Sequence, residues 1–76
     1  MAAIRPISSQ DLIRVLERDG FRFDRQEGDH RIYIKAGAKR PLVIPVYRAI
    51  PVFIIKNLLR TSGMSRDRYF ELLGGL

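Results

Sequence analysis

The sequence predicts a small α+β domain with the order α-β-β-β-α and a short additional helix at the C-terminus. Three observations favour this fold class. Apolar residues first recur with helical spacing, hydrophobicity then alternates with a period of two, and an almost wholly apolar segment follows a proline at position 51. Two helices that pack on one face of a three-stranded antiparallel sheet leave its other face open to solvent. The 76 residues suffice for one domain, 1–76, whose ordered core we expect at about residues 8–73.

The first predicted helix covers residues 9–19. Ser8 can cap it, and Asp11 suits its positive N-terminus, as in a weak variant of the capping box. Gly20 stands where helices commonly end in a left-handed residue. The apolar stripe of this helix consists of Leu12, Ile13, Val15 and Leu16.

Three strands are expected next, and turns that contain glycine join them. The first strand covers residues 21–26, and the turn Glu27-Gly28-Asp29 leads into the second. Pro41 and Pro45 bracket the third, which we expect to be a short edge strand because neither proline can donate to a ladder.

The second strand alternates apolar and polar side chains. Ile32 and Ile34 fall on one face, and the residues between and around them fall on the other. We expect that second set on the open face of the sheet. It consists of Arg31, Tyr33 and Lys35.

Pro51 suits the first turn of a second helix, which Gly63 ends. Its first turns are apolar on nearly every side, as in helices that are buried against a sheet. Ser65 can cap a last short helix over residues 66–73, with Phe70 and Leu73 as its apolar pair.

The formal net charge is +6, and its distribution is uneven. No Asp or Glu lies between His30 and Arg66, a stretch that contains seven further Lys and Arg residues. A run of one sign creates a field suited to phosphate or to an acidic partner. The plainer interpretation is a solvated basic surface without a ligand.

Composition excludes several classes of protein. Without cysteine there is no disulfide, thiolate metal site or cysteine nucleophile, and one histidine cannot form a histidine-rich metal site. Asp24, Glu27 and Asp29 match no metal-loop spacing, and no cofactor motif is present. No signal peptide or membrane span is recognisable, so a cytoplasmic location is expected.

His30 is the best candidate for a catalytic residue. Cleavage of RNA without a metal needs a base for the ribose 2′-hydroxyl, an acid for the leaving oxygen and cations near the phosphate. A histidine exchanges its proton near neutral pH and can serve as either the base or the acid. Arg31 and Lys35 could hold the phosphate, and Tyr33 and Tyr47 could stack on bases. A single exposed histidine without a role is the alternative.

The order and spacing of several short motifs resemble the HicA (YcfA-like) toxins of toxin–antitoxin pairs. The resemblance extends from about Ser8 to Leu73. The motifs are Ser9-Gln10-Asp11-Leu12-Ile13, Asp19-Gly20-Phe21, Gly28-Asp29-His30, Ile44-Pro45-Val46, Leu58-Leu59-Arg60-Thr61-Ser62-Gly63-Met64-Ser65 and Tyr69-Phe70-Glu71-Leu72-Leu73.

This resemblance implies a fold like that of a double-stranded-RNA-binding domain and the activity of an mRNA interferase that arrests translation. It implies that His30, in the position of the family's Gly-Ser-His histidine, is catalytic, and that a HicB-like antitoxin covers the site. We expect RNA contacts from a set of residues around this histidine. The set is Gly28, Asp29, Arg31, Tyr33, Lys35 and Tyr47.

Two residues depart from the family pattern. Asp29 replaces the usual serine, and a carboxylate there would favour the imidazolium form of His30 and repel phosphate. Tyr47 replaces the histidine of the family's Val-Pro-x-His pattern. A binding module that grips RNA without cutting it therefore remains the alternative, and a protein that binds only an acidic partner is a third hypothesis. Edge strands also allow weak self-association.

Overall fold

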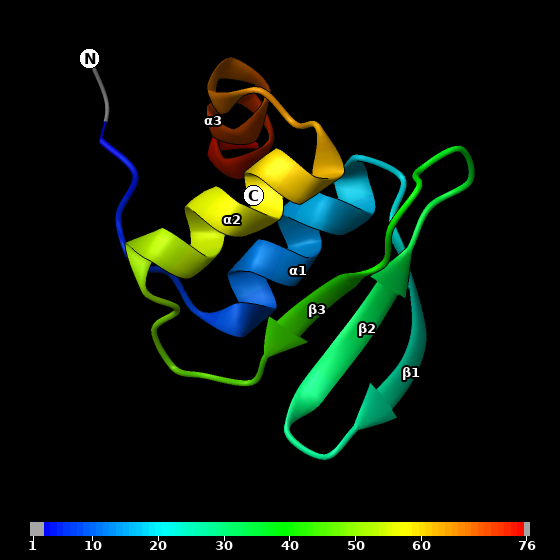
Figure 1. Ribbon diagram of the computed structural model, residues 1–76. Helices are drawn as coiled ribbons and strands as arrows, with labels where there is room; N and C mark the ends of the chain where they lie inside the picture. The colour runs from blue at the N-terminus through cyan, green and yellow to red at the C-terminus, as the bar shows by residue number, and fades with distance from the viewer. Residues whose placement is uncertain (1–2, 76) are drawn as a thin grey trace.

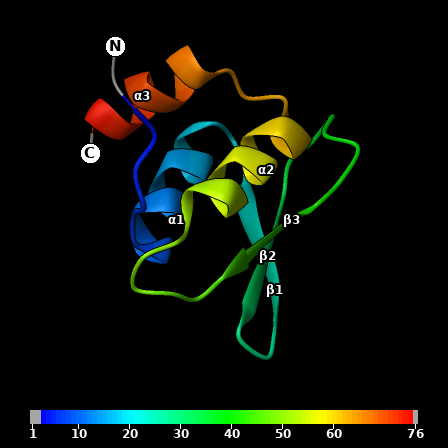
Figure 2. The ribbon, with the colours of Figure 1, turned by 60° about the vertical axis from the view of Figure 1, so that its left-hand side comes forward.

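A computed structural model describes residues 3–75, which form three helices and one three-stranded sheet. Figure 1 shows their order along the chain, and Figure 2 shows that the helices all lie on one side of the sheet. The predicted α-β-β-β-α order with an added helix is confirmed. The elements are α1 (Ser9–Arg18), β1 (Arg22–Glu27), β2 (His30–Ile34), β3 (Leu42–Pro45), α2 (Val52–Ser62) and α3 (Arg66–Gly74).

Helix α1 forms the centre of the core. The Ser8 hydroxyl accepts a hydrogen bond from the Asp11 amide at 3.1 Å, which confirms the predicted cap. Gly20 has a φ of 98°, a left-handed conformation that suits glycine, and the helix ends two residues before it. The predicted apolar stripe is buried. Its most deeply buried members, each 0% exposed, are Leu12, Val15 and Leu16.

The three strands form an antiparallel meander with the order β1-β2-β3. Glu27 pairs with His30 across a two-residue turn, and Gly28 has the positive φ of 58° that the turn requires. β3 lies at an edge, as its two prolines predict. An irregularity between Phe23 and Arg25 shifts the register of β1, and the sequence did not indicate it.

The predicted faces of β2 were wrong. Tyr33 is only 1% exposed and belongs to the core under the helices, because it pairs with Leu42, which is also buried. Arg31 pairs with the buried Ile44 and therefore shares the helix-covered face. Ile32 lies on the open face, where Val43 is its cross-strand neighbour on β3. It is nevertheless only 2% exposed, so hydrophobicity alone could not distinguish the two faces of this central strand.

The β1–β2 hairpin extends beyond the helices at its turn (Figure 1). Every residue of β1 is exposed, and so is His30 at the start of β2. The hairpin end is thus held by strand pairing with little packing, and its side chains are accessible.

Helix α2 begins after Pro51 and ends before Gly63, which has a φ of 73°, as expected. It is less buried than its composition predicts, since Phe53 is 66% exposed. In α3, Ser65 provides the predicted cap at 3.0 Å from the Arg68 amide. The buried side chains of α3 are Tyr69 and Leu72, with the expected pair Phe70 and Leu73 only partly buried beside them.

The ordered core was expected to begin at about residue 8, but Ile7 already anchors the segment before α1. Ile7 forms an isolated antiparallel bridge with Ile50, whose amide donates to the Ile7 carbonyl at 2.6 Å. Ile4 and Ile7 both pack against the core. The expectations for residues 1 and 2 lie outside the described part of the chain.

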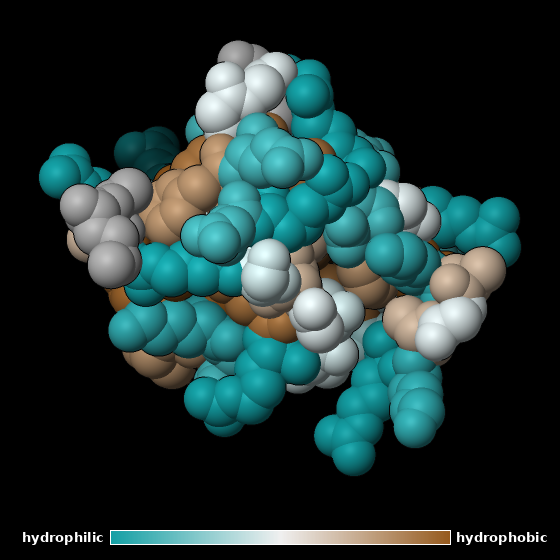
Figure 3. Space-filling view, turned by 90° about the horizontal axis from the view of Figure 1, so that it is seen from above, coloured by the Kyte–Doolittle hydropathy of each residue, from teal (hydrophilic) through white to brown (hydrophobic). Residues whose placement is uncertain are grey.

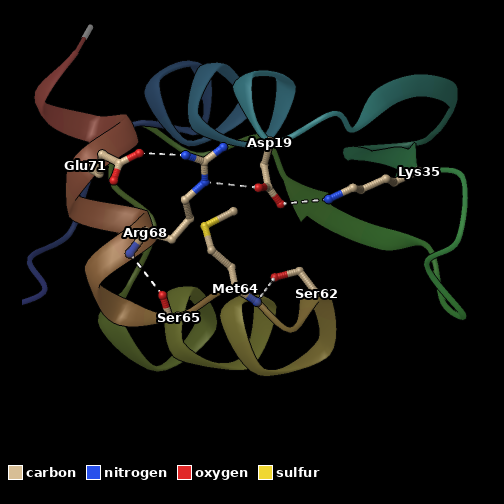
Figure 4. Close-up of polar contacts among 7 residues, drawn as sticks. All are labelled: Asp19, Lys35, Ser62, Met64, Ser65, Arg68 and Glu71. Carbon is tan, nitrogen blue, oxygen red and sulfur yellow. Dashed lines mark hydrogen bonds and ion pairs between the residues drawn. The ribbon is translucent and has the colours of Figure 1, made fainter.

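Asp19 joins three elements at the end of α1 (Figure 4). Its carboxylate lies 3.2 Å from the Lys35 ammonium, just after β2, and 3.4 Å from the Arg68 guanidinium of α3. Arg68 also contacts Glu71 at 2.6 Å. Only 14% of the Asp19 side chain is exposed, so these ion pairs are partly shielded from water and fix α3 to the sheet.

Candidate functional site

His30 is exposed on the open face at the first position of β2. Its cross-strand neighbours are Glu27 on β1 and Pro45 on β3. The Asp29 carbonyl accepts a hydrogen bond from the Val46 amide at 2.9 Å, which holds the turn against the end of β3. Among residues 3–75 the imidazole has no hydrogen-bond or ion-pair partner, so the backbone fixes its place while its ring nitrogens are free to meet a ligand.

The charges around His30 are more acidic than the sequence indicated. Arg25 lies on the same face, but it forms ion pairs with Asp24 and with Glu27, the latter at 3.2 Å. The hydrogen bonds that Arg25 donates to Asp24 and then to Glu27 raise the pKa of its guanidinium above the ordinary value. With Asp29 in the adjacent turn, three carboxylates and one guanidinium surround the hairpin end.

Arg31 lies on the opposite face of β2 from His30. Its guanidinium carbon is 4.8 Å from the centre of the Phe23 ring and 5.9 Å from that of Tyr33. Its Nε is buried and has no hydrogen-bond partner among the described residues. Aromatic rings therefore hold this side chain, and within residues 3–75 it forms no ion pair with a carboxylate.

A groove of about 470 Å³ separates α1 from this face of β2. Arg31 and Tyr33 lie on its sheet wall, and Arg14 and Glu17 on its helix wall. Burial, the largest cause, raises the pKa of the Tyr33 hydroxyl, Arg31 lowers it and Glu17 raises it further. Sequence reasoning missed Arg14, although its spacing of three from Glu17 on one helix face was visible.

The expected open-face roles of Tyr33 and Lys35 need correction. A ring that is 1% exposed cannot stack on a base, although Tyr33 forms part of the groove wall. Lys35 lies five residues from His30, roughly 17 Å along the strand. Its ammonium contacts Asp19 and lies 5.4 Å from the centre of the Phe21 ring, so Lys35 connects parts of the fold.

Tyr47 lies near the hairpin end of the sheet and is 48% exposed. Its carbonyl accepts a hydrogen bond from the Ser9 amide at 3.1 Å, which links the chain after β3 to the start of α1. The ring is accessible, and its stacking on a base stays a prediction.

Another group of basic residues lies at the end of the sheet opposite the β1–β2 turn. Lys39 and Arg40 of the β2–β3 loop and Arg60 of α2 line a hollow of about 320 Å³ together with Thr61. Seen from above the view of Figure 1, hydrophilic side chains cover most of the surface, and hydrophobic patches show between them (Figure 3).

Within residues 3–75, no three His, Cys, Asp or Glu side chains gather as a metal site would require. No helix in that range has the length and hydropathy needed to cross a membrane.

The fold and the site define a class of protein: a basic α+β domain with an accessible histidine on a hairpin. The family model described as the HicA toxin of bacterial toxin–antitoxin systems matches residues 9–64, which include β2 and His30. The chain therefore belongs to the HicA toxin family and is the toxin of a toxin–antitoxin pair. Helix α3 follows the matched span. No curated protein matches the chain.

Proposed function

We propose that this toxin is a metal-independent endoribonuclease that cleaves mRNA and so arrests translation. One observation carries the proposal: His30, inside the span that matches the HicA family, is exposed and has no side-chain partner among the described residues. An imidazole in this state can take the proton from a ribose 2′-hydroxyl or give one to the leaving oxygen. General acid–base catalysis of this kind contributes about 10²–10⁴-fold to a rate.

The RNA contacts proposed around His30 come from neighbouring backbone and side chains. Gly28 and Asp29 form the turn directly before it, and a phosphate can approach the glycine closely because no side chain intervenes. Tyr47 can stack on a base with its exposed ring. A HicB-like antitoxin that covered this hairpin end would block all three contacts.

The test is RNA cleavage by purified wild-type and His30→Ala proteins in EDTA, with new 5′ ends mapped by primer extension. We expect His30→Ala to lose about 10²-fold or more of the activity. It should also lose growth arrest on expression while keeping its circular dichroism spectrum. Lys56→Gln, a change at an exposed position on α2, serves as the control and should cleave like the wild type. Undiminished cleavage by His30→Ala would refute the catalytic role.

A non-catalytic RNA-binding module is the second candidate, and the acidic surroundings of His30 favour it. Glu27 faces His30 across the hairpin and Asp29 adjoins it, so phosphate is repelled where cleavage would occur. RNA that binds the wild-type protein in EDTA and yields no new 5′ ends would support this function instead. Binding to an acidic protein without RNA affinity at low salt would support the third hypothesis, an interaction protein.

A further inference from the structure

The groove between α1 and β2 contains two arginines without ion pairs, whereas Arg25 on the face of His30 is paired with carboxylates. Arg14 projects from the helix wall and Arg31 from the sheet wall. Neither guanidinium forms an ion pair within 4.0 Å among residues 3–75. Both guanidiniums therefore keep their charge available to a ligand, and an arginine can hold a phosphate through two parallel N–H donors.

Arg31 is pre-positioned for an anion. Phe23 packs against its guanidinium at 4.8 Å, and its buried Nε has no acceptor in the described part of the chain. A stacked guanidinium loses little conformational freedom on binding, and its terminal N–H groups match the oxygens of a phosphate. The structure thus keeps a cation without an ion pair among residues 3–75 in a fixed orientation beside a groove.

The groove also reaches the hairpin that carries His30. Val46 lines it, and the Val46 amide donates to the Asp29 carbonyl in the turn. Arg31 directly follows His30, so their Cα atoms are about 3.8 Å apart while their side chains point to opposite faces. A strand that passes round this end of β2 can meet both residues.

We propose that this groove binds the phosphodiester backbone of RNA next to the nucleotide at His30, a proposal that rests on the proposed function. Arg14 and Arg31 hold one phosphate from opposite walls, and the exposed side chain of Val46 offers an apolar surface to the attached base. Glu17 lies in the same groove and opposes the phosphate. The affinity for RNA therefore comes from one face of β2 and the chemistry from the other.

The test measures binding of a 2′-O-methyl RNA oligonucleotide, which has no 2′-hydroxyl to attack, by fluorescence anisotropy over a range of KCl concentrations. We expect Arg14→Gln and Arg31→Gln each to weaken binding about tenfold at low salt and to reduce the salt slope by roughly 0.7–1. Glu17→Gln should tighten binding several-fold, because it removes a like charge. Lys56→Gln, which removes one cation outside the groove, is the matched control and should change affinity by less than about twofold.

Opposite shifts for the arginine and glutamate variants support the groove, since a general loss of structure would weaken both. Arg14→Gln changes an exposed helix position, so it tests the proposal even if Arg31→Gln unfolds. Arginine variants that bind like Lys56→Gln would overturn the proposal, as would binding of polyglutamate in preference to RNA. Cleavage is measured separately. Groove-dependent binding without cleavage supports this inference and refutes the proposed function. Cleavage by arginine variants whose RNA binding is unchanged supports the proposed function and refutes this inference.

Discussion

The two ends of strand β2 treat their charged residues in opposite ways. At the packed end, Lys35, which directly follows the strand, contacts Asp19 at 3.2 Å and lies 5.4 Å from the centre of the Phe21 ring. At the hairpin end, His30 is exposed and has no side-chain partner within residues 3–75. One strand of five residues thus runs from an anchored end to an open one.

This difference shows where the fold can accommodate function. The Lys35 ammonium is paired with Asp19 of the α1 end, which also pairs with Arg68 of α3 (Figure 4). The charge of Lys35 therefore stabilises the domain and is not available to RNA. The hairpin end depends on strand pairing and a few hydrogen bonds to the turn, with no core packing, so its side chains can change without loss of the core. We therefore expect substitutions at the packed end to reduce stability and those at the hairpin end to reduce activity.

The largest expected difference compares Tyr33→Ala with His30→Ala. Tyr33 is 1% exposed, and its truncation leaves a cavity under the helices, at a cost of about 3–5 kcal/mol in the free energy of unfolding. His30→Ala removes an exposed side chain and should change that free energy by less than about 0.5 kcal/mol. Urea denaturation followed by circular dichroism measures both. Equal losses in the free energy of unfolding would show that the hairpin end contributes to stability as much as the packed end does.

The sequence predicted the element order and most helix ends because those depend on local chemistry. Ser8 and Ser65 cap their helices as expected, and Gly63 ends α2 in a left-handed conformation. The hairpin turn at Gly28 was likewise readable, since positive φ favours glycine. Each of these features is decided within four or five residues of chain.

The faces of β2 could not be predicted because they depend on pairing between strands. Tyr33 faces the core through its register with Leu42, and the irregularity after Phe23 changes which β1 residues share that face. The candidate site was predictable only at His30 itself. The groove beside Arg31 was not, because Arg14 approaches it from a helix that is distant in sequence.

Asp19→Asn tests the packed end more gently. Asp19 contacts both Lys35 and Arg68, whose side chains are 35% and 43% exposed, so water weakens each pair. We expect a loss of about 1–2 kcal/mol in the free energy of unfolding that shrinks in 1 M salt. Asp24→Asn, which affects an exposed pair on the hairpin, is the control and should cost less than about 0.5 kcal/mol. A cost for Asp24→Asn as large as that for Asp19→Asn would contradict the comparison.

Tyr69→Phe probes the α3 side of the packed end. The Tyr69 hydroxyl is buried and has no hydrogen-bond partner among the described residues, so its removal should stabilise the domain by roughly 0.5–1 kcal/mol.

The same hydroxyl should make stability depend on alkaline pH. Burial, and then Asp11, raise the pKa of Tyr69 above 10.0, its ordinary value. The unfolded chain therefore ionises first, and stability that is complete below pH 10 falls as the pH rises toward the raised pKa. Urea midpoints measured from pH 8 upward should fall less for Tyr69→Phe than for the wild type. A destabilised Tyr69→Phe would mean that the hydroxyl has a partner.

The smallest expected effect is at the open end, at Asp29, where the resemblance to HicA toxins predicts a serine. A carboxylate about 5–6 Å from a phosphate in water costs the complex roughly 0.6 kcal/mol, so Asp29→Ser should tighten RNA binding about threefold in 10 mM salt and less at higher salt. Asp67→Asn on α3 removes the same charge elsewhere and serves as the matched control. If both variants tighten binding equally, net charge explains the gain. If Asp29→Ser weakens binding, the Asp29 carboxylate accepts a hydrogen bond from RNA, and aspartate at this position contributes to substrate binding.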